Sequence, residues 1–253
     1  MMQSLQNRLK QEIQQNSKLK IMESFLWCVP IHTIEVEYKR IKRTKMDVLM
    51  KIMLISFQKT DITSSMQLSE LLLVENLFID DLIDVMKKSG LIEKEEDSIS
   101  LTSKGIQQLE EGIFEEEQEP GTQNILYSPS HEAFLKGEIK PASEGEELLE
   151  VYRYAKEEKK KLLLEDRLLL EAVEESKVEV TEGDAPLIII SEIITSSELY
   201  IDDIPCLEYI VYNESDDLFF ARVWNTLTDR WDEVLEEQLN EKERLNWRKK
   251  YLN

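Results

Sequence analysis

The apolar positions near the start of the chain repeat with the period of a helix. Leu5, Leu9 and Ile13 are spaced four residues apart, and the apolar stripe continues to Leu26 after a polar break. This spacing predicts one amphipathic helix, or two helices that meet at the break, in an N-terminal segment of residues 1–30. This helix could pack on its own domain, bind a partner or form a homodimer through the stripe.

The period changes after residue 30. In Ile31–Tyr38 apolar and polar side chains alternate, as in a half-buried strand. Helical spacing then returns at Met46, Met50, Met53 and Phe57. We therefore expect a strand that pairs with a later hairpin, followed by the first helix of a small module. A methionine stripe usually belongs to a core, although methionine also serves adaptable interfaces.

The residues after this helix carry the most specific pattern. Val74, Ile79, Ile83 and Met86 have the spacing of the buried positions of two further helices. A glycine turn, a strand, an acidic turn and a second strand follow, and the second strand ends in Leu-Thr-Ser-Lys-Gly at residues 101–105. Over residues 31–112 the chain resembles the winged helix-turn-helix superfamily. The resemblance implies a winged-helix domain, residues 31–113, whose third helix would face DNA.

The charge at the outward positions of that third helix is unfavourable for DNA binding. These positions include Asp80, Asp81 and Asp84, and the expected wing tip is acidic as well. Phosphate neutralisation supplies most non-specific DNA affinity, so such a surface should bind duplex DNA poorly. Leu77 and Phe78 are apolar beyond what the core pattern requires, and they are either a protein-contact anchor or buried against the wing or the second domain. We take these five residues as the candidate partner-binding site.

The second half of the chain predicts an acidic α+β domain. The glutamates before Pro120 and Gly121 indicate a boundary, so residues 114–143 are expected to form an acidic linker and loop. The domain at 144–253 would hold a long charged helix over residues 144–176 and a small antiparallel sheet. Its parts would be strands at 178–180 and 187–194, a hairpin at 207–224, and a C-terminal helix over 232–251 capped by Thr228 or Asp229.

The charge is unevenly distributed along the chain. The formal net charge is −21, yet residues 1–60 hold 11 basic and 5 acidic side chains, a local excess of +6. A basic turn between the first strand and the first helix lies where some winged helices contact the DNA backbone. It offers five candidate phosphate contacts: Lys39, Arg40, Lys42, Arg43 and Lys45. A solvated turn, or ion pairs with the acidic half, is the preferred interpretation of these cations.

The sequence offers little for catalysis. No phosphate-binding loop, dinucleotide fingerprint or zinc-protease motif occurs, and Cys28 and Cys206 lack metal-ligand spacing. His131 follows Ser128 in a loop without the elbow of a serine nucleophile, so a structural role is expected for it. We expect no enzyme activity, cofactor or metal. No apolar run is long enough to span a membrane, and a cytoplasmic protein is expected.

These patterns favour a non-enzymatic protein-interaction subunit that uses a winged helix, in a larger nucleic-acid-handling or regulatory complex. The fold class we expect is α+β, a winged helix followed by the acidic domain. Two alternatives remain: a transcriptional regulator that binds DNA through its basic turn, and an acidic inhibitor that mimics DNA. The expected partner is a protein, and charge disfavours nucleic acid.

Overall fold

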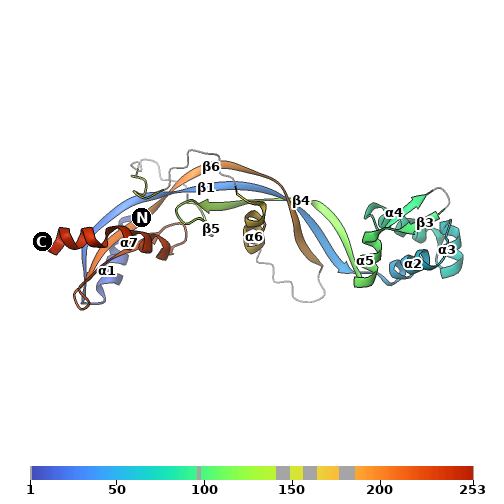
Figure 1. The fold of residues 1–253 in the computed structure, drawn as a ribbon, viewed down its shortest axis with the longest axis horizontal. Coiled ribbons are helices and arrows are strands. Elements are labelled where there is room, and N and C mark those ends of the chain that lie inside the picture. Colours follow the sequence, from blue (N-terminus) through green and yellow to red (C-terminus); the bar gives the residue numbers. More distant parts are fainter. Residues whose placement is uncertain (1, 96–97, 141–148, 156–163, 177–185, 253) are drawn as a thin grey trace. The chain divides into compact units, whose positions relative to one another are not determined.

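The computed structural model describes residues 2–95, 98–140, 149–155, 164–176 and 186–252. Figure 1 shows the elements of this part of the chain as ribbons. The helices are α1 (Met2–Gln14), α2 (Val48–Lys59), α3 (Ser65–Leu72), α4 (Asn76–Lys88), α5 (Ser103–Glu111), α6 (Asp166–Ser176) and α7 (Glu233–Leu252). The strands are β1 (Leu19–Lys45), β2 (Ile92–Glu95), β3 (Ser98–Leu101), β4 (Ile113–Ser128), β5 (Ala133–Leu135), β6 (Leu187–Asn213), β7 (Leu218–Asn225) and β8 (Arg230–Trp231).

A large antiparallel sheet dominates the fold, and roughly 41% of the described residues are in strands. Its strand order is β5-β4-β1-β6-β7-β8, and β2 and β3 form a separate hairpin. The expectation of a winged-helix domain followed by a small sheet was therefore wrong. Helices α2 to α5 come between two neighbouring strands of the large sheet, β1 and β4, instead of preceding a second domain.

The chain divides into two compact units, which we describe separately. Unit 1 combines residues 1–36, 123–176 and 196–253, and unit 2 combines residues 37–122 and 177–195. Both units contain parts of β1 and β6, so neither is a continuous stretch of sequence.

Unit 1 is built on the β6–β7 hairpin, and a helix covers each of its faces. Successive side chains of a strand point to opposite faces. Cys206 and Ile210 therefore join Leu235 and Leu239 of α7 in one core, while Leu207, Tyr209 and Val211 pack with Leu9 and Ile13 of α1 in another. The hairpin expected from the sequence is confirmed, with Leu207 opposite Trp224 and Tyr212 opposite Phe219.

The N-terminal helix is shorter than the apolar stripe predicted. α1 ends at Gln14, and residues 19–26 belong to β1, a strand of 27 residues. The expected strand Ile31–Tyr38 lies within β1, but its neighbours are β4 and β6 instead of the β2–β3 hairpin. The polar break at Gln14–Lys18 is thus the point where helix changes to strand.

The long helix expected over residues 144–176 was wrong for the described residues 149–155 and 164–165, and right for its last part. Val151 makes an isolated bridge to Cys28, and only Asp166–Ser176 is helical. The expected strand at 178–180 lies outside the described residues. The expected acidic linker begins with β4, a 16-residue strand. The C-terminal helix is confirmed, but Asp232 caps it instead of Thr228 or Asp229, because its Oδ1 accepts from the N–H of Leu235 at 3.2 Å.

Unit 2 holds the helical module predicted from the sequence, and Figure 1 shows α2 to α5 gathered with the β2–β3 hairpin. Met50 and Met53 of α2, Ile79, Ile83 and Met86 of α4, and Ile92 and Ile99 of the hairpin share one buried core. Caps set the helix starts: Asp47 accepts from two backbone N–H groups of α2, and Thr102 accepts from Gly105 at the start of α5. Membership of the winged-helix superfamily stays a prediction.

No helix in the described ranges is both long enough and apolar enough to cross a bilayer.

Candidate functional site

Large apolar side chains are exposed around the turn between α3 and α4, and three of them follow the end of α3. Leu73 is 92% exposed, Leu77 70% and Phe78 62%. Asp81 and Asp84 follow on the exposed side of α4. We call these five residues the α4 face. Leu77 and Phe78 are therefore not buried against the wing, which was one of the two interpretations that the sequence left open.

The local backbone explains why this face is presented. Ile79, Ile83 and Met86 anchor the opposite side of α4 in the module core. Leu73 ends α3 in the left-handed region, with φ at 56°, a conformation that favours glycine. The Ser69 hydroxyl donates to the Val74 carbonyl at 2.7 Å, which fastens the turn. The apolar residues are thus held at a fixed corner.

The acidic positions of α4 divide into two groups. Asp81 and Asp84 are exposed, but Asp80 is half-buried and accepts a hydrogen bond from the side-chain amide of Asn76 at 2.7 Å. Asp80 therefore serves its own helix and is set apart from the other four residues that the sequence analysis proposed. The sequence analysis missed Leu73, and the signal that could have found it is a leucine at a helix end where glycine is usual.

The five basic candidates lie at the end of β1, in a strand instead of a turn. Lys39 Nζ lies 2.6 Å from Glu192 Oε2, Arg43 Nε lies 2.6 Å from Glu115 Oε1, and Lys42 Nζ lies 3.9 Å from Glu116 Oε2. Arg40 Nε donates to the Glu119 carbonyl at 2.8 Å. The hydrogen bond and the charge of Glu192 raise the pKa of Lys39.

Lys45 has a different setting. Together with Arg43 and Lys51 it lines an open cavity of about 1040 Å³ beside the start of α2. Carboxylates and a carbonyl of neighbouring strands thus engage four of the five cations, so phosphate would have to compete for them.

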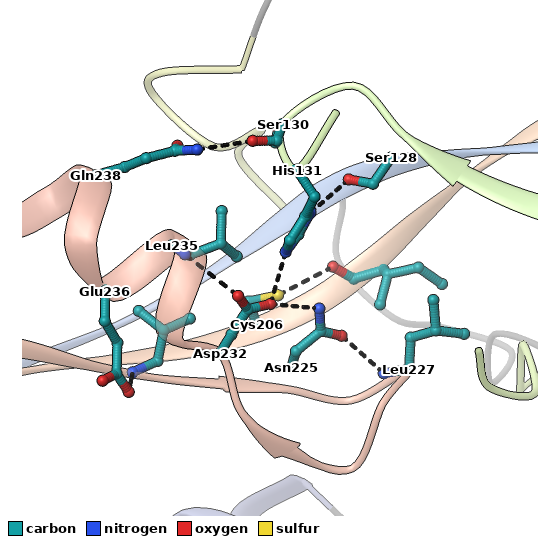
Figure 2. Close-up of polar contacts among 12 residues, drawn as sticks. Ser128, Ser130, His131, Cys206, Asn225, Leu227, Asp232, Leu235, Glu236 and Gln238 are labelled. Carbon is teal, nitrogen blue, oxygen red and sulfur yellow. Dashed lines mark hydrogen bonds and ion pairs between the residues drawn. The ribbon is translucent and has the colours of Figure 1, made fainter. Parts of the chain in front are cut away.

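A buried polar chain lies in unit 1, at the start of α7 (Figure 2). His131 lies between two partners, with Nδ1 2.6 Å from Ser128 Oγ and Nε2 2.8 Å from Asp232 Oδ2. A carboxylate only accepts hydrogen bonds, so the ring donates from Nε2, and in its neutral form accepts the Ser128 hydroxyl at Nδ1. Asn225 Nδ2 also donates to Asp232 Oδ2 at 2.8 Å.

This polar chain has the residue types of a serine hydrolase triad, but its serine is not accessible to a substrate. Ser128 is fully buried, and the side chains of His131 and Asp232 are only 5% and 7% exposed. Substrate therefore has no route to the hydroxyl in this conformation. The contacts instead tie the turn after β4 to the start of α7. His131 and Asp232 are 101 residues apart, so no sequence pattern could have paired them.

Burial and hydrogen bonding shift the pKa of Asp232, the acid of this polar chain, in opposite directions. Burial alone would raise the pKa of Asp232, but hydrogen bonds from His131, Asn225 and the Leu235 N–H hold it below its ordinary value. The neighbouring Cys206 thiol has its pKa raised by burial first and by Asp232 second, so it stays protonated and a poor nucleophile.

A groove of about 350 Å³ lies between β1 and α7, lined by Trp27, Arg153 and Trp247 among others. Its two cations are paired: Arg153 with Glu208 and Glu243, and Lys250 with Glu23. Over the described ranges, no group of three or more His, Cys, Asp or Glu side chains is placed to hold a metal ion.

Comparison with protein-family models, curated proteins and solved structures finds no match for this chain.

Proposed function

We propose that this chain is a non-enzymatic protein-interaction subunit, and that the α4 face is the surface through which it binds a partner protein. The module would be a winged helix used for protein contacts, in a larger nucleic-acid-handling or regulatory complex. The observation that carries the proposal is the exposure of Leu77 and Phe78 on a helix whose other side is anchored in a core.

Hydrophobic burial gives this surface its binding energy. Fully burying a leucine or phenylalanine side chain is worth about 1.5–3 kcal/mol. Aromatic residues that fill a partner pocket are frequent hot spots of interfaces. Phe78 is the aromatic member of the α4 face, and Leu73 and Leu77 extend its apolar area.

The charge of the surface indicates the chemistry of the partner. Asp81 and Asp84 border the apolar residues, and the chain as a whole carries a formal charge of −21. Complementary potentials favour encounter and exclude unsuitable partners. We therefore propose a partner surface that combines an apolar pocket with Lys or Arg side chains around it, such as a basic amphipathic helix or groove.

Site-specific photocrosslinking in the cells that express the protein tests this proposal. A photoreactive phenylalanine analogue at position 78 should capture one partner reproducibly. The same analogue at Leu245, which is 75% exposed on α7, is the matched control. The captured protein is then purified, and its binding to Leu77→Ser and Phe78→Ser variants is measured.

The crosslinking and binding results distinguish the α4 face from other binding surfaces. Capture at position 78 but not at 245, together with binding weakened about tenfold or more by Phe78→Ser, supports the α4 face as the interface. Equal capture at both positions, or unchanged affinity of a variant that keeps the native circular dichroism spectrum, would show that the partner binds elsewhere.

A further inference from the structure

An open strand edge lies in unit 1. β6 has β1 on one side, and on the other side β7 pairs only with Cys206–Asn213. The N–H and hydroxyl of Thr226 donate to the Pro205 carbonyl and close the edge at that point. For Ser196–Ile204 the sheet order provides no second neighbour among the described strands. We call this segment the β6 edge.

The β6 edge is exposed, and no described strand pairs with its open side. Leu199, Tyr200 and Ile201 are consecutive and 45%, 51% and 52% exposed, so apolar side chains on both faces of the strand reach solvent. The neighbouring β1 is buried over the same part of the sheet, with Ile31 and Val36 fully covered. A long exposed apolar edge is a template for another strand, and soluble proteins usually protect such edges.

The charges on the edge are acidic. Glu198, Asp202 and Asp203 lie on this segment, and His32 of β1 hydrogen-bonds Glu198 at 2.8 Å. The Asp202 Oδ2 atom is buried and has no hydrogen-bond partner in the part of the chain that the structure describes. A buried acceptor without a donor is costly, so this carboxylate adds an unmet hydrogen-bonding requirement to the acidic edge.

We propose that the β6 edge binds an extended partner segment with alternating apolar and basic side chains, which adds to the sheet as a further strand. Backbone hydrogen bonds would provide the affinity, and Leu199 and Ile201 would contact the apolar side chains. Lys or Arg side chains of the segment would lie on the opposite face, with Glu198 and Asp202. The edge accommodates about 30 Å of extended chain at ~3.3 Å per residue.

Charge argues against a second copy of this chain as the occupant. Two β6 edges paired with each other would bring the acidic residues of both copies together, and like charges on facing strands destabilise a sheet. Self-association is therefore an alternative outcome of the test.

The test uses the full-length protein and a defined probe, a capped peptide with four Lys-Val repeats. Transverse relaxation-optimised NMR maps the chemical-shift changes that the peptide causes in the backbone amides of the protein. We expect shifts concentrated in Ser196–Ile204, and affinity reduced at least tenfold by Ile201→Lys but unchanged by the matched Leu245→Lys variant. A Glu-Val peptide and a peptide with alternate N-methylated amides should both bind at least tenfold more weakly.

Three results would overturn the proposal. The perturbed amides could lie outside the β6 edge, or the N-methylated peptide could bind as well as the parent, which would exclude strand addition. The protein could also be a dimer by light scattering that Ile201→Lys converts to monomer, which would make a second copy the occupant. None of these results depends on the α4 face.

Discussion

Arg153 binds the carboxylate of Glu208 through two hydrogen bonds, at 2.8 and 2.9 Å, although Glu208 is completely buried. Trp27 Nε1 donates to the same carboxylate at 2.7 Å. Arg153 lies in the short segment after residue 148, and its Nε also reaches Glu243 of α7 at 3.0 Å. One guanidinium thus connects this segment, the centre of β6 and α7.

Removing that guanidinium should destabilise the protein strongly. Arg153→Met leaves the buried Glu208 charge without its main partner. Breaking a fully buried pair from one side costs about 3–5 kcal/mol, and the 37% exposure of the Arg153 side chain reduces this figure. Arg167→Met is the control, because Arg167 makes an exposed i,i+4 pair with Glu171 that is worth under about 1 kcal/mol. Urea denaturation of both variants measures the difference. Equal losses in the two variants would show that Glu208 does not depend on Arg153.

The polar chain around His131 predicts how stability changes in acid. The folded-state pKa of Asp232 lies below its ordinary value, so its stabilisation is complete above about pH 4 and is lost as pH falls through the folded pKa. Asp232→Asn should cost about 1–3 kcal/mol at neutral pH and reduce the loss of stability in acid. Denaturation from pH 7 to pH 3 measures this, with Asp216→Asn in the exposed hairpin turn as control. An acid profile unchanged by Asp232→Asn would contradict the assignment.

Glu236 should have the opposite pH dependence. Burial raises its pKa to about 7, although the Val223 N–H and Arg222 favour the charged form. The folded protein then holds a proton that the unfolded chain releases, so this group reduces stability as pH rises from about 4.5 to 7. Glu236→Gln should gain stability relative to wild type between pH 5 and pH 8, on the order of 1–3 kcal/mol. The exposed neighbour variant Glu237→Gln should show no such gain.

The ion pairs of β1 predict weak DNA binding. Lys39, Lys42 and Arg43 already pair with carboxylates, and the α4 face is acidic. Fluorescence anisotropy with labelled duplex DNA at about 50 mM salt should show no binding up to ~10⁻⁵ M protein. Tight binding that weakens steeply with salt, and that Arg43→Ala and Lys45→Ala abolish, would instead support the DNA-binding regulator.

The helical module could be predicted from the sequence because its signals are local. Apolar spacing located Ile79, Ile83 and Met86 in the core, and Thr102 stands where a capping residue is needed. The sequence marked Phe78 as an apolar residue outside the core pattern, but it did not decide whether its side chain is exposed or buried. An apolar residue beyond the core pattern is compatible with an interface or with burial, and the choice depends on what packs against it.

The large sheet could not be predicted because the strands that pair in it are far apart in sequence. The glutamates that begin β4 resemble a solvated linker until the cations of β1, about 70 residues earlier, are placed opposite them, as Arg43 is to Glu115. Residues 39–45 likewise resemble a turn only while Glu192 and Glu115 are ignored. Charge complementarity between distant strands has no local period, and the same limitation hid the contacts of His131 with Asp232 and of Arg153 with Glu208.

The affinity of the purified partner for two matched variants tests the central claim most directly. Isothermal titration calorimetry compares Phe78→Ser, in the α4 face, with Leu245→Ser, an equally drastic change at an exposed position of α7. If the α4 face is the interface, Phe78→Ser raises the Kd about tenfold or more, while Leu245→Ser leaves it at the wild-type value. A Kd that is unchanged by Phe78→Ser, with native folding retained, would contradict the account.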